Sequence, residues 1–545
     1  MRRILTYLFT AVLFVIILTP EAFPEDRPYG GTLVWGTCHR PTAINPLFTT
    51  QSISISLQSL LFNTLVRWNS RGEIEADLAK SWDISPDGRV YTFYLRKGVR
   101  FHDGVECTAE DVKFTFDKLT DPRLGSPFRP LLQLVKESRA AAPYTFQVVL
   151  NEPSPSFIYK LIREILPRHI LESRDLRGDP FNSHPVGTGP FRFKGYDKDG
   201  QITLEYNPDY YEGRPYLDKI VVRSCGDARQ LWAKLMRQEV DLALFIERED
   251  YEVLKDDPAF KAYVLPIDYY YAVVYNPDDP ILADRSVREA VAHSIDRESL
   301  IKQIAFGYGV ECNSPFYPGS IGFNSQVKPF EFNLKKAEAL LREAGWSDSD
   351  KDGILEKGSE QLEIRVLIDS RNQVYHRMGM LLRQQLQEAG IKLVLHLYNN
   401  ESQLTDDFLE QNKLSGQLRL LLAGVDPDEI GIDWYKQTTG RVDNLWAYKN
   451  PEVERYFSLG RTTQNKGKKE WIYKEIHSFI YKDQPALFLY YPFHFHVISS
   501  KFRYADELFT LSMPFYTLKD WSMREEYIKG KGGDRGWRLS DMGQR

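Results

Sequence analysis

The chain has 545 residues, of which 42% are hydrophobic and 27% are charged, and its formal net charge is -5. This composition is typical of a folded chain and excludes a largely disordered one. The length exceeds the roughly 250 to 300 residues that one hydrophobic core supports, so two or more lobes are expected. Because basic residues are not in excess, nucleic acid is not an expected partner.

The N-terminus has the features of a secretory signal. Two arginines precede an apolar run over residues 4–18, which is shorter than the about 20 residues of a membrane-spanning helix. We expect residues 1–24 to be a signal peptide and the protein to be periplasmic. An uncleaved anchor is the alternative, because Pro20 makes a poor cleavage site. No cysteine follows the run, so lipid attachment is not expected.

Four cysteines lie in the exported part: Cys38, Cys107, Cys225 and Cys312. An oxidising compartment permits disulfides among them, and their pairing cannot be deduced from the sequence. Their spacing contains no CxxC pair and no accompanying histidine, which argues against a structural zinc site. We expect one disulfide or none.

The first predicted elements are a buried strand, a loop and a helix. GTLVW at 31–35 has the composition of a buried strand, and the proline-bounded loop PTAINP at 41–46 follows it. Loops after buried strands often carry function. The apolar spacing over 54–68 predicts a helix.

A β-rich region follows. The Ser-Pro-Asp-Gly turn at 85–88 separates two segments, and alternation over 91–95 is typical of a half-buried strand. Thr108, with Glu110 and Asp111 after it, predicts the start of a helix.

Strands and helices then alternate. Glycine and proline cluster at 186–191 and 207–215, and the later segments predict two α/β lobes. The predicted strands are 191–196, 202–207, 218–225, 240–246, 269–276, 363–368 and 391–398, and the predicted helices are 228–239, 286–304, 333–345 and 375–390.

Residues 78–117, LAKSWDISPDGRVYTFYLRKGVRFHDGVECTAEDVKFTFD, closely resemble the signature block of the bacterial extracellular solute-binding proteins of family 5, the peptide and nickel binders. Further blocks of the chain agree with that family in order: VGTGPF at 186, LMRQEVDLA at 235, SVREAVAHSIDRESLI at 286, AEALLREAGW at 337, LRQQLQEAGI at 382 and NPEVERY at 450.

The resemblance implies an α/β fold of the periplasmic-binding-protein type, with two α/β lobes, a two-segment hinge and a β-rich inserted third domain. It assigns lobe I to residues 25–62, 187–280 and 497–533, the insert to 63–186, and lobe II to 281–496. Residues 534–545 are expected to form a flexible tail.

The function implied by the resemblance is the substrate-binding component of an ABC importer. Such a protein captures peptides in the periplasm and delivers them to permease subunits in the inner membrane. A monomer without cofactor, metal or catalytic residues is expected. The alternatives are binding of nickel or another small solute in the same fold, and an exported hydrolase, which the absence of HExxH, GxSxG and phosphate-loop motifs disfavours.

Three polar groups have structural explanations that we prefer to functional ones. His102 lies in a predicted turn and is expected to satisfy backbone groups. Asp348, Asp350 and Asp352 with the following glycine match the opening of a calcium loop, but Ser359 occupies the position of the closing glutamate and Glu360 is one residue late, so a solvated acidic turn is favoured. His494 and His496 are expected to pack at the hinge rather than to bind metal.

Aromatic residues near strand ends and loops supply the candidate cleft: Trp35, Phe48, Tyr269, Tyr270, Tyr271, Trp434 and Trp446. An apolar pocket with few polar anchors is the usual design of a solute site, and about half of these residues are expected to line it. The predicted ligand contacts are Asn45, Phe48, Tyr269, Tyr271, Arg371, Asp426, Trp434 and Asn444.

A bound peptide needs partners for its two charged ends. In peptide-binding relatives an aspartate holds the ammonium, four residues before a proline in the block that here contains LLLAGVDPDE; this chain has Ala423 at that position. Asp426, beside Pro427, is expected to substitute for it. Arg371 follows a predicted strand and is expected to hold the carboxylate by paired hydrogen bonds.

Overall fold

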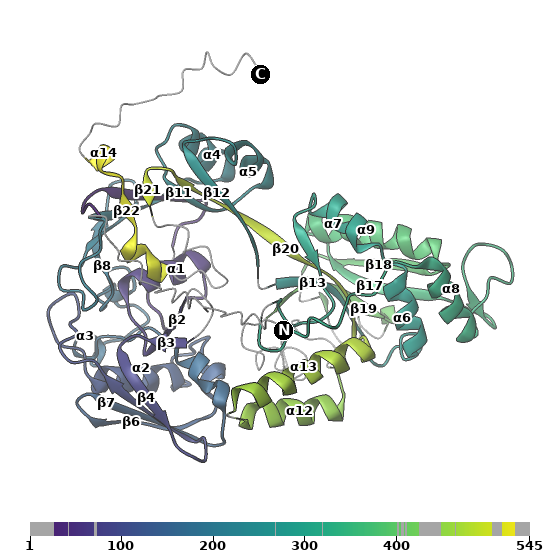
Figure 1. The fold of residues 1–545 in the computed structure, drawn as a ribbon, viewed down its shortest axis with the longest axis horizontal. Helices are drawn as coiled ribbons and strands as arrows, with labels where there is room; N and C mark the ends of the chain where they lie inside the picture. The colour runs from purple at the N-terminus through teal and green to yellow at the C-terminus, as the bar shows by residue number, and fades with distance from the viewer. Residues whose placement is uncertain are drawn as a thin grey trace, which may run out of the picture.

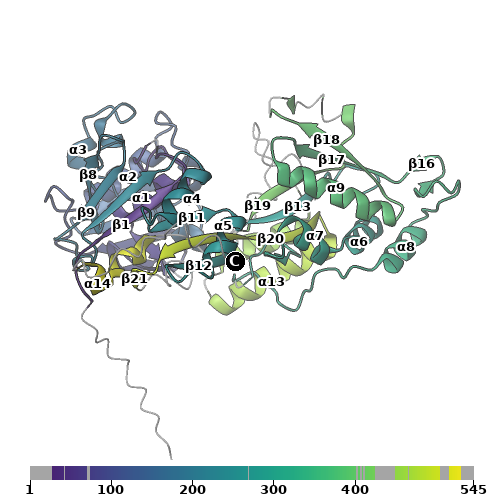
Figure 2. The ribbon, with the colours of Figure 1, turned by 90° about the horizontal axis from the view of Figure 1, so that it is seen from above.

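The computed structural model describes residues 27–41, 43–69, 74–267, 269–318, 320–400, 403–404, 408, 411–423, 448–463, 465–503 and 515–528. The predicted signal peptide and tail lie outside these ranges. Within them, two bodies lie side by side and are joined by strands of one twelve-stranded sheet, as Figures 1 and 2 show. The predicted fold class is confirmed.

The left body in Figure 1 is built around parallel strands. β1 (Thr32–Thr37) pairs in parallel with β10 (Lys219–Ser224) and with β11 (Leu242–Ile246). Antiparallel strands extend this sheet beyond β10. They are β9 (Ile202–Tyr206) and β8 (Phe191–Tyr196), while α1 (Ser52–Leu61), α4 (Ala228–Met236) and α5 (Arg248–Leu254) are the helices of this body.

A second, four-stranded sheet lies below it in the order β4-β5-β7-β6. Its helix α2 (Ala109–Thr120) begins as the sequence predicts, because the Thr108 side chain accepts from the Glu110 amide and Asp111 accepts from the Thr108 amide. The elements are β2 (Val66–Trp68), β3 (Ile74–Ala76), β4 (Ala79–Ile84), β5 (Val90–Leu95), β6 (Val135–Ala142), β7 (Thr145–Leu150) and α3 (Arg168–Leu171).

The right body contains a parallel β-α-β unit, in which α9 (Gln373–Glu388) connects β17 (Glu363–Asp369) to β18 (Lys392–Tyr398). The sheet continues from β17 through β19 (Gly416–Leu422) to β13 (Tyr269–Tyr275). The other elements are α6 (Arg285–His293), α7 (Arg297–Ile304), β14 (Gly309–Glu311), α8 (Leu334–Glu343), β15 (Glu356–Lys357), β16 (Glu360–Gln361), α12 (Pro451–Thr462) and α13 (Lys466–Asp483).

One long strand, β20 (Ala486–Ser499), belongs to both bodies. Its first part pairs with β13, and its last part pairs with β11 and with β12 (Phe260–Pro266). Pro492, which has no amide hydrogen to donate, lies between the two parts. After β20 the chain returns to the left body through β21 (Phe502–Arg503), β22 (Ser522–Met523) and α14 (Glu525–Ile528).

The chain therefore crosses between the bodies twice, between β12 and β13 and again within β20 near Pro492. Both crossings precede the predicted lobe boundaries at 280 and 496. The resemblance alone supplied those boundaries, and strand pairing cannot be read from the sequence. The division of the remaining chain into lobes and insert stays a prediction.

Two predicted helices end earlier than their apolar spacing suggests. The helix over 54–68 stops at Leu61, because the Thr64 amide donates to the buried carboxylate of Asp77, at 2.8 Å, instead of continuing the helix. The helix over 286–304 is two helices, since Asp296 accepts from the Ser299 amide and starts α7.

None of the helices in the described ranges is long and apolar enough to cross a lipid bilayer.

The VGTGPF segment at 186–191 lies between the region of the four-stranded sheet and helix α1, and it contacts both. The Gly187 amide donates to Nδ1 of His102, and Nε2 of His102 lies 3.1 Å from the Gly189 carbonyl. Both ring nitrogens are used by backbone groups, and desolvation lowers the pKa of His102 to about 4, so the ring is neutral. The predicted structural role of His102 is confirmed.

Close packing explains the glycines of this segment. A Cβ added to Gly187 would lie 1.9 Å from the Leu61 carbonyl oxygen, whereas a Cβ on Gly178 would meet nothing within 4 Å. The backbone of α1 would have to move to admit a methyl group at Gly187.

We predict that Gly187→Ala lowers the free energy of unfolding by about 3 kcal/mol, because the added methyl group overlaps main-chain atoms. Gly178→Ala is the matched control and should change it by less than about 0.5 kcal/mol. Urea denaturation measures both. Equal stability of the two variants would contradict the packing explanation.

Candidate ligand cavity

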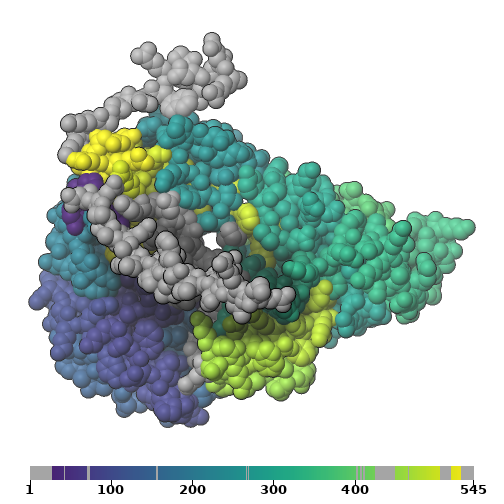
Figure 3. Space-filling model, viewed as in Figure 1, coloured from purple at the N-terminus to yellow at the C-terminus, as the bar shows by residue number. Residues whose placement is uncertain are grey.

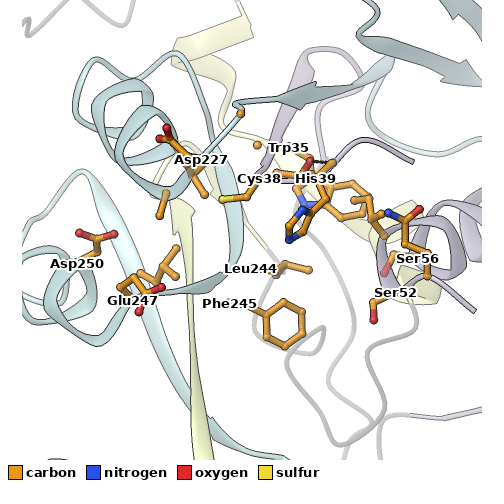
Figure 4. Close-up of a pocket in the computed structure, with 18 residues that line it drawn as sticks. Trp35, Cys38, His39, Ser52, Ser56, Asp227, Leu244, Phe245, Glu247 and Asp250 are labelled. Atoms are coloured by element: carbon orange, nitrogen blue, oxygen red, sulfur yellow. Dashed lines mark hydrogen bonds between the residues drawn. The ribbon is translucent and has the colours of Figure 1, made fainter. Parts of the chain in front are cut away.

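A cavity of about 550 Å³ opens in the left body at the carboxyl ends of β1 and β11 (Figure 4). The side chains around it come from both strands and from the starts of α1, α4 and α5. The lining residues are Trp35, Gly36, Thr37, Cys38, His39, Gln51, Ser52, Ile53, Ser56, Gly226, Asp227, Ala228, Leu231, Leu244, Phe245, Ile246, Glu247 and Asp250.

The topology of the sheet places the cavity at this edge. β10, β1 and β11 are parallel neighbours, so the loops that follow them emerge on the same side. Ligands of open α/β sheets bind outside the carboxyl ends of such strands. A space-filling view shows an opening through the molecule between its two bodies (Figure 3).

Phe245 lies next to Leu244 among the residues that line the cavity (Figure 4). Its backbone φ is +56°, and the pairing of β11 with β20 shifts register around it. A bulky residue in this region of φ is strained and is common at functional sites. The ring is 44% exposed, so burial of the ring in a core does not explain the strained backbone.

Two histidines of β20 hold Phe245. Its ring meets those of His494 and His496 edge to face, with centroids 4.7 and 5.1 Å away, and its amide lies 3.3 Å from Nδ1 of His496. Desolvation lowers the pKa of His494 to about 4 and that of His496 to about 3, so both rings are neutral. The predicted packing role of both histidines at the hinge is confirmed.

Three carboxylates give the cavity its charge: Asp227, Glu247 and Asp250. The Gln230 amide lowers the pKa of Asp227, which caps α4. Partial burial, together with the charges of Glu247 and Glu249, raises the pKa of Asp250 to about 6. No lysine or arginine is among the described lining residues, so the cavity favours a cationic group.

Cys38 and Cys225 follow paired positions of β1 and β10, since Thr37 lies opposite Ser224 and the Cys225 amide donates to the Thr37 carbonyl. Burial raises the pKa of both thiols. All four cysteines are described, and all four are free thiols.

Of the eight predicted ligand contacts, two serve the loop after β1. Asn45 is fully buried and its amide donates to the Asn182 side chain at 2.7 Å, while its carbonyl oxygen accepts from the Leu47 amide. Phe48 is half-buried beneath the Arg177 guanidinium. Neither lines the cavity described above.

Three more predicted contacts belong to the right body. Tyr269 begins β13 and is 40% exposed, whereas Tyr271 is buried against Tyr375 and Tyr490. Arg371 follows β17 and forms an ion pair with Asp369. The other three predicted contacts, Asp426, Trp434 and Asn444, lie outside the described residues, as does Trp446.

Trp35 lines the cavity, as its place among the candidate aromatics suggests. Phe245 and the three carboxylates were not predicted. Their signal in the sequence is weak: an apolar strand followed by an acidic segment, ALFIERED at 243–250, which could equally be a solvated helix start.

Comparison with known proteins identifies the class. The family described as bacterial extracellular solute-binding proteins, family 5 Middle, matches residues 73–441. The oligopeptide-binding protein AppA of Bacillus subtilis is 30% identical over 477 residues, which are 85% of this chain and 86% of AppA. The dipeptide-binding protein of Escherichia coli is 26% identical, over 84% of this chain and 89% of that protein. This chain belongs to family 5 of the bacterial extracellular solute-binding proteins.

Solved structures agree. AppA from Bacillus subtilis in complex with a nonapeptide superposes with a TM-score of 0.68 at 26% identity, covering 91% of this chain and 99% of AppA. NikZ from Campylobacter jejuni in complex with Ni(L-His) superposes with a TM-score of 0.71 at 26% identity, covering 90% and 99%. The same fold therefore carries solutes of different chemistry.

We predict that Phe245→Gly is more stable than Phe245→Ala by about 1 kcal/mol, because only glycine adopts a positive φ without strain. At Phe332, an exposed residue outside the positive-φ set, alanine should be at least as stable as glycine. Urea denaturation of the four variants measures the two differences. The same order at both positions would contradict the strained conformation of Phe245.

We predict a pH-dependent effect of Asp250→Asn. A carboxyl whose pKa is higher in the folded than in the unfolded state destabilises the fold as the pH rises from about 4 to about 7. The variant lacks this loss, so its stability relative to the wild type should increase over that range. Thermal unfolding at pH 4 and 7 measures this, with the exposed Asp256→Asn as control. A difference that does not depend on pH would refute the raised pKa.

Proposed function

We propose that this protein captures peptides and delivers them to the permease of an ABC importer, and that a peptide is held between its two bodies. The observation that carries the proposal is the cavity itself. It combines two aromatic side chains, Trp35 and Phe245, with three carboxylates and no lysine or arginine among its described lining. That lining suits an apolar side chain beside an ammonium group.

The carboxylates of the cavity would determine the orientation of the bound peptide, because they attract its N-terminal ammonium. AppA of Bacillus subtilis is an oligopeptide-binding protein and the Escherichia coli relative is a dipeptide-binding protein. A peptide carries one ammonium at its N-terminus. Asp227, Glu247 and Asp250 offer that ammonium a choice of partners. The absence of aspartate at position 423, where peptide-binding relatives have one, is then accommodated by carboxylates of the opposite body or by Asp426.

The predicted contacts of the right body complete the proposal. Tyr269, Tyr271, Trp434 and Asn444 would cover the peptide from β13 and from the segment after β19. Arg371 would hold the C-terminal carboxylate, with its guanidinium shared with Asp369. Asn45 and Phe48 would act by supporting the loop beside β1 rather than by touching the ligand.

We further propose that the mature protein is a periplasmic monomer without lipid anchor, cofactor or enzymatic activity. The apolar run at the N-terminus and the lack of a following cysteine support export without lipidation. A purified sample that hydrolyses its peptide ligand would contradict the non-enzymatic role.

Nickel bound to histidine is the second candidate, because the exposed His39 lines the cavity together with three carboxylates. A nickel chelate and a peptide require different groups in the site. The metal needs imidazole or carboxylate ligands, whereas the peptide needs partners for its backbone hydrogen bonds. Titration with nickel and L-histidine in place of peptide distinguishes the two.

We predict that Phe245→Ala weakens peptide binding by about 2 kcal/mol, roughly thirtyfold, because it removes an aromatic contact from the lining of the cavity. Phe332→Ala, on an exposed loop residue that does not line the cavity, should leave the affinity unchanged. Calorimetric titration with a peptide fraction measures both. Equal affinity of the two variants would contradict a contact between Phe245 and the peptide.

We predict that N-acetylation of the peptide weakens its binding at least tenfold, since the bound peptide would cover the ion pair, and an ammonium paired with a buried carboxylate contributes about 2 to 5 kcal/mol. The same titration on Asp250→Asn and Asp426→Asn identifies the carboxylate responsible, because that variant should bind both peptide forms alike. If acetylation does not change the affinity of the wild type, the acidic cavity is not the ammonium site.

A further inference from the structure

Four carboxylates converge in the loop between α8 and β17, far from the cavity. Asp348, Asp350, Asp352 and Glu356 each offer one oxygen, and these oxygens lie within 4.8 Å of one another. The sequence suggested a solvated acidic turn, because the twelve-residue spacing of an EF-hand puts Ser359 at the closing position. The fold closes the loop three residues earlier, with Glu356.

Glu356 is held in place by its own strand. Its backbone pairs with Ser347 across an antiparallel bridge, with hydrogen bonds of 2.9 and 3.0 Å. One carboxylate oxygen, Oε2, accepts from the amide and the hydroxyl of Ser349, each at 3.0 Å. The residue is therefore oriented before any ligand binds.

The other oxygen of Glu356 lacks a partner. The side chain is 9% exposed, and Oε1 is buried without any hydrogen-bond donor in the described part of the chain. A buried carboxylate oxygen is normally paired with a donor or a cation. This atom is the second indication, besides the acidic cluster, that a ligand belongs here.

None of the described basic side chains forms an ion pair with the cluster, although Lys351 lies in the same loop. Within the described ranges, no lysine, arginine or histidine nitrogen lies within 4.0 Å of these four carboxylates. The nearest basic residue along β15, Lys357, donates to the Ala344 carbonyl at 2.9 Å instead. Four negative charges without a counter-charge repel one another, and a divalent cation would relieve that repulsion.

We propose that this loop binds one Ca²⁺ ion through Asp348, Asp350, Asp352 and Glu356. Oxygen ligands of calcium lie about 2.3 to 2.6 Å from the ion, so two of them can be separated by up to about 5 Å, which accommodates the 4.8 Å spread. Magnesium, with ligands at about 2.0 to 2.1 Å, requires a closer set. Gly353, at φ +88°, makes the sharp turn that brings the acids together.

The ion would stabilise the connection between α8, α9 and β17 in the right body. Leu355, inside the loop, donates its amide to the Gly390 carbonyl at the end of α9 and accepts from the Leu362 amide just before β17. A cation that fixes residues 348–356 thereby fixes the connection between α8, α9 and β17. The expected role is structural and independent of the solute.

Calorimetric titration of CaCl₂ into chelator-treated protein tests the proposal. One calcium per chain is expected, with a rise in Tm by mass action. Glu356→Gln and Asp350→Asn should each weaken binding at least tenfold and remove the Tm rise. Asp350 is exposed, so its variant should fold even if Glu356→Gln does not.

The matched control is Asp87→Asn, which alters an exposed aspartate that also precedes a glycine of positive φ, Gly88. It should bind calcium as the wild type does. No heat and no Tm change at millimolar calcium, or wild-type affinity in Asp350→Asn, would overturn the proposal. Equal affinity for magnesium would overturn the choice of calcium.

Discussion

The shared strand β20 is the constraint on which the rest of the structure depends. Its 14 residues hydrogen-bond to β13 in one body and to β11 and β12 in the other. A single strand therefore belongs to the sheet of both bodies and connects their cores. Pro492 lies where the partners change and donates no amide hydrogen, which weakens the ladder at that point.

The same strand positions the ligand cavity. His494 and His496 follow Pro492 in β20, and their rings pack against Phe245, which has a strained backbone conformation near the end of β11. On the other side of the proline, Tyr491 is anchored in the right body by hydrogen bonds from its hydroxyl to the carbonyls of Ser314 and Phe316. Neighbouring residues of one strand therefore contact the cavity on one side of Pro492 and the right body on the other.

Local signals in the sequence were sufficient for much of the fold. The capping residue Thr108, the turn at 85–88 and the β-α-β order after residue 363 depend on neighbours along the chain, and all three are present. Features that depend on distant segments could not be predicted. The positive φ of Phe245 follows from its pairing with β20, about 250 residues away, and the closing role of Glu356 follows from its bridge to Ser347 rather than from a motif spacing. Of the cavity residues, Trp35 was among the candidate aromatics but not among the predicted ligand contacts, and the acids and Phe245 were in neither set.

Small-angle scattering of the protein with and without saturating peptide tests the central claim, that a solute is held between two bodies hinged at β20. A ligand that touches both bodies gains its full set of contacts only when they approach, so binding stabilises the closed arrangement. We predict a smaller radius of gyration with peptide, and no such change in Phe245→Ala at a concentration where the wild type is saturated. An unchanged radius in the wild type, with binding verified by calorimetry, would contradict the account.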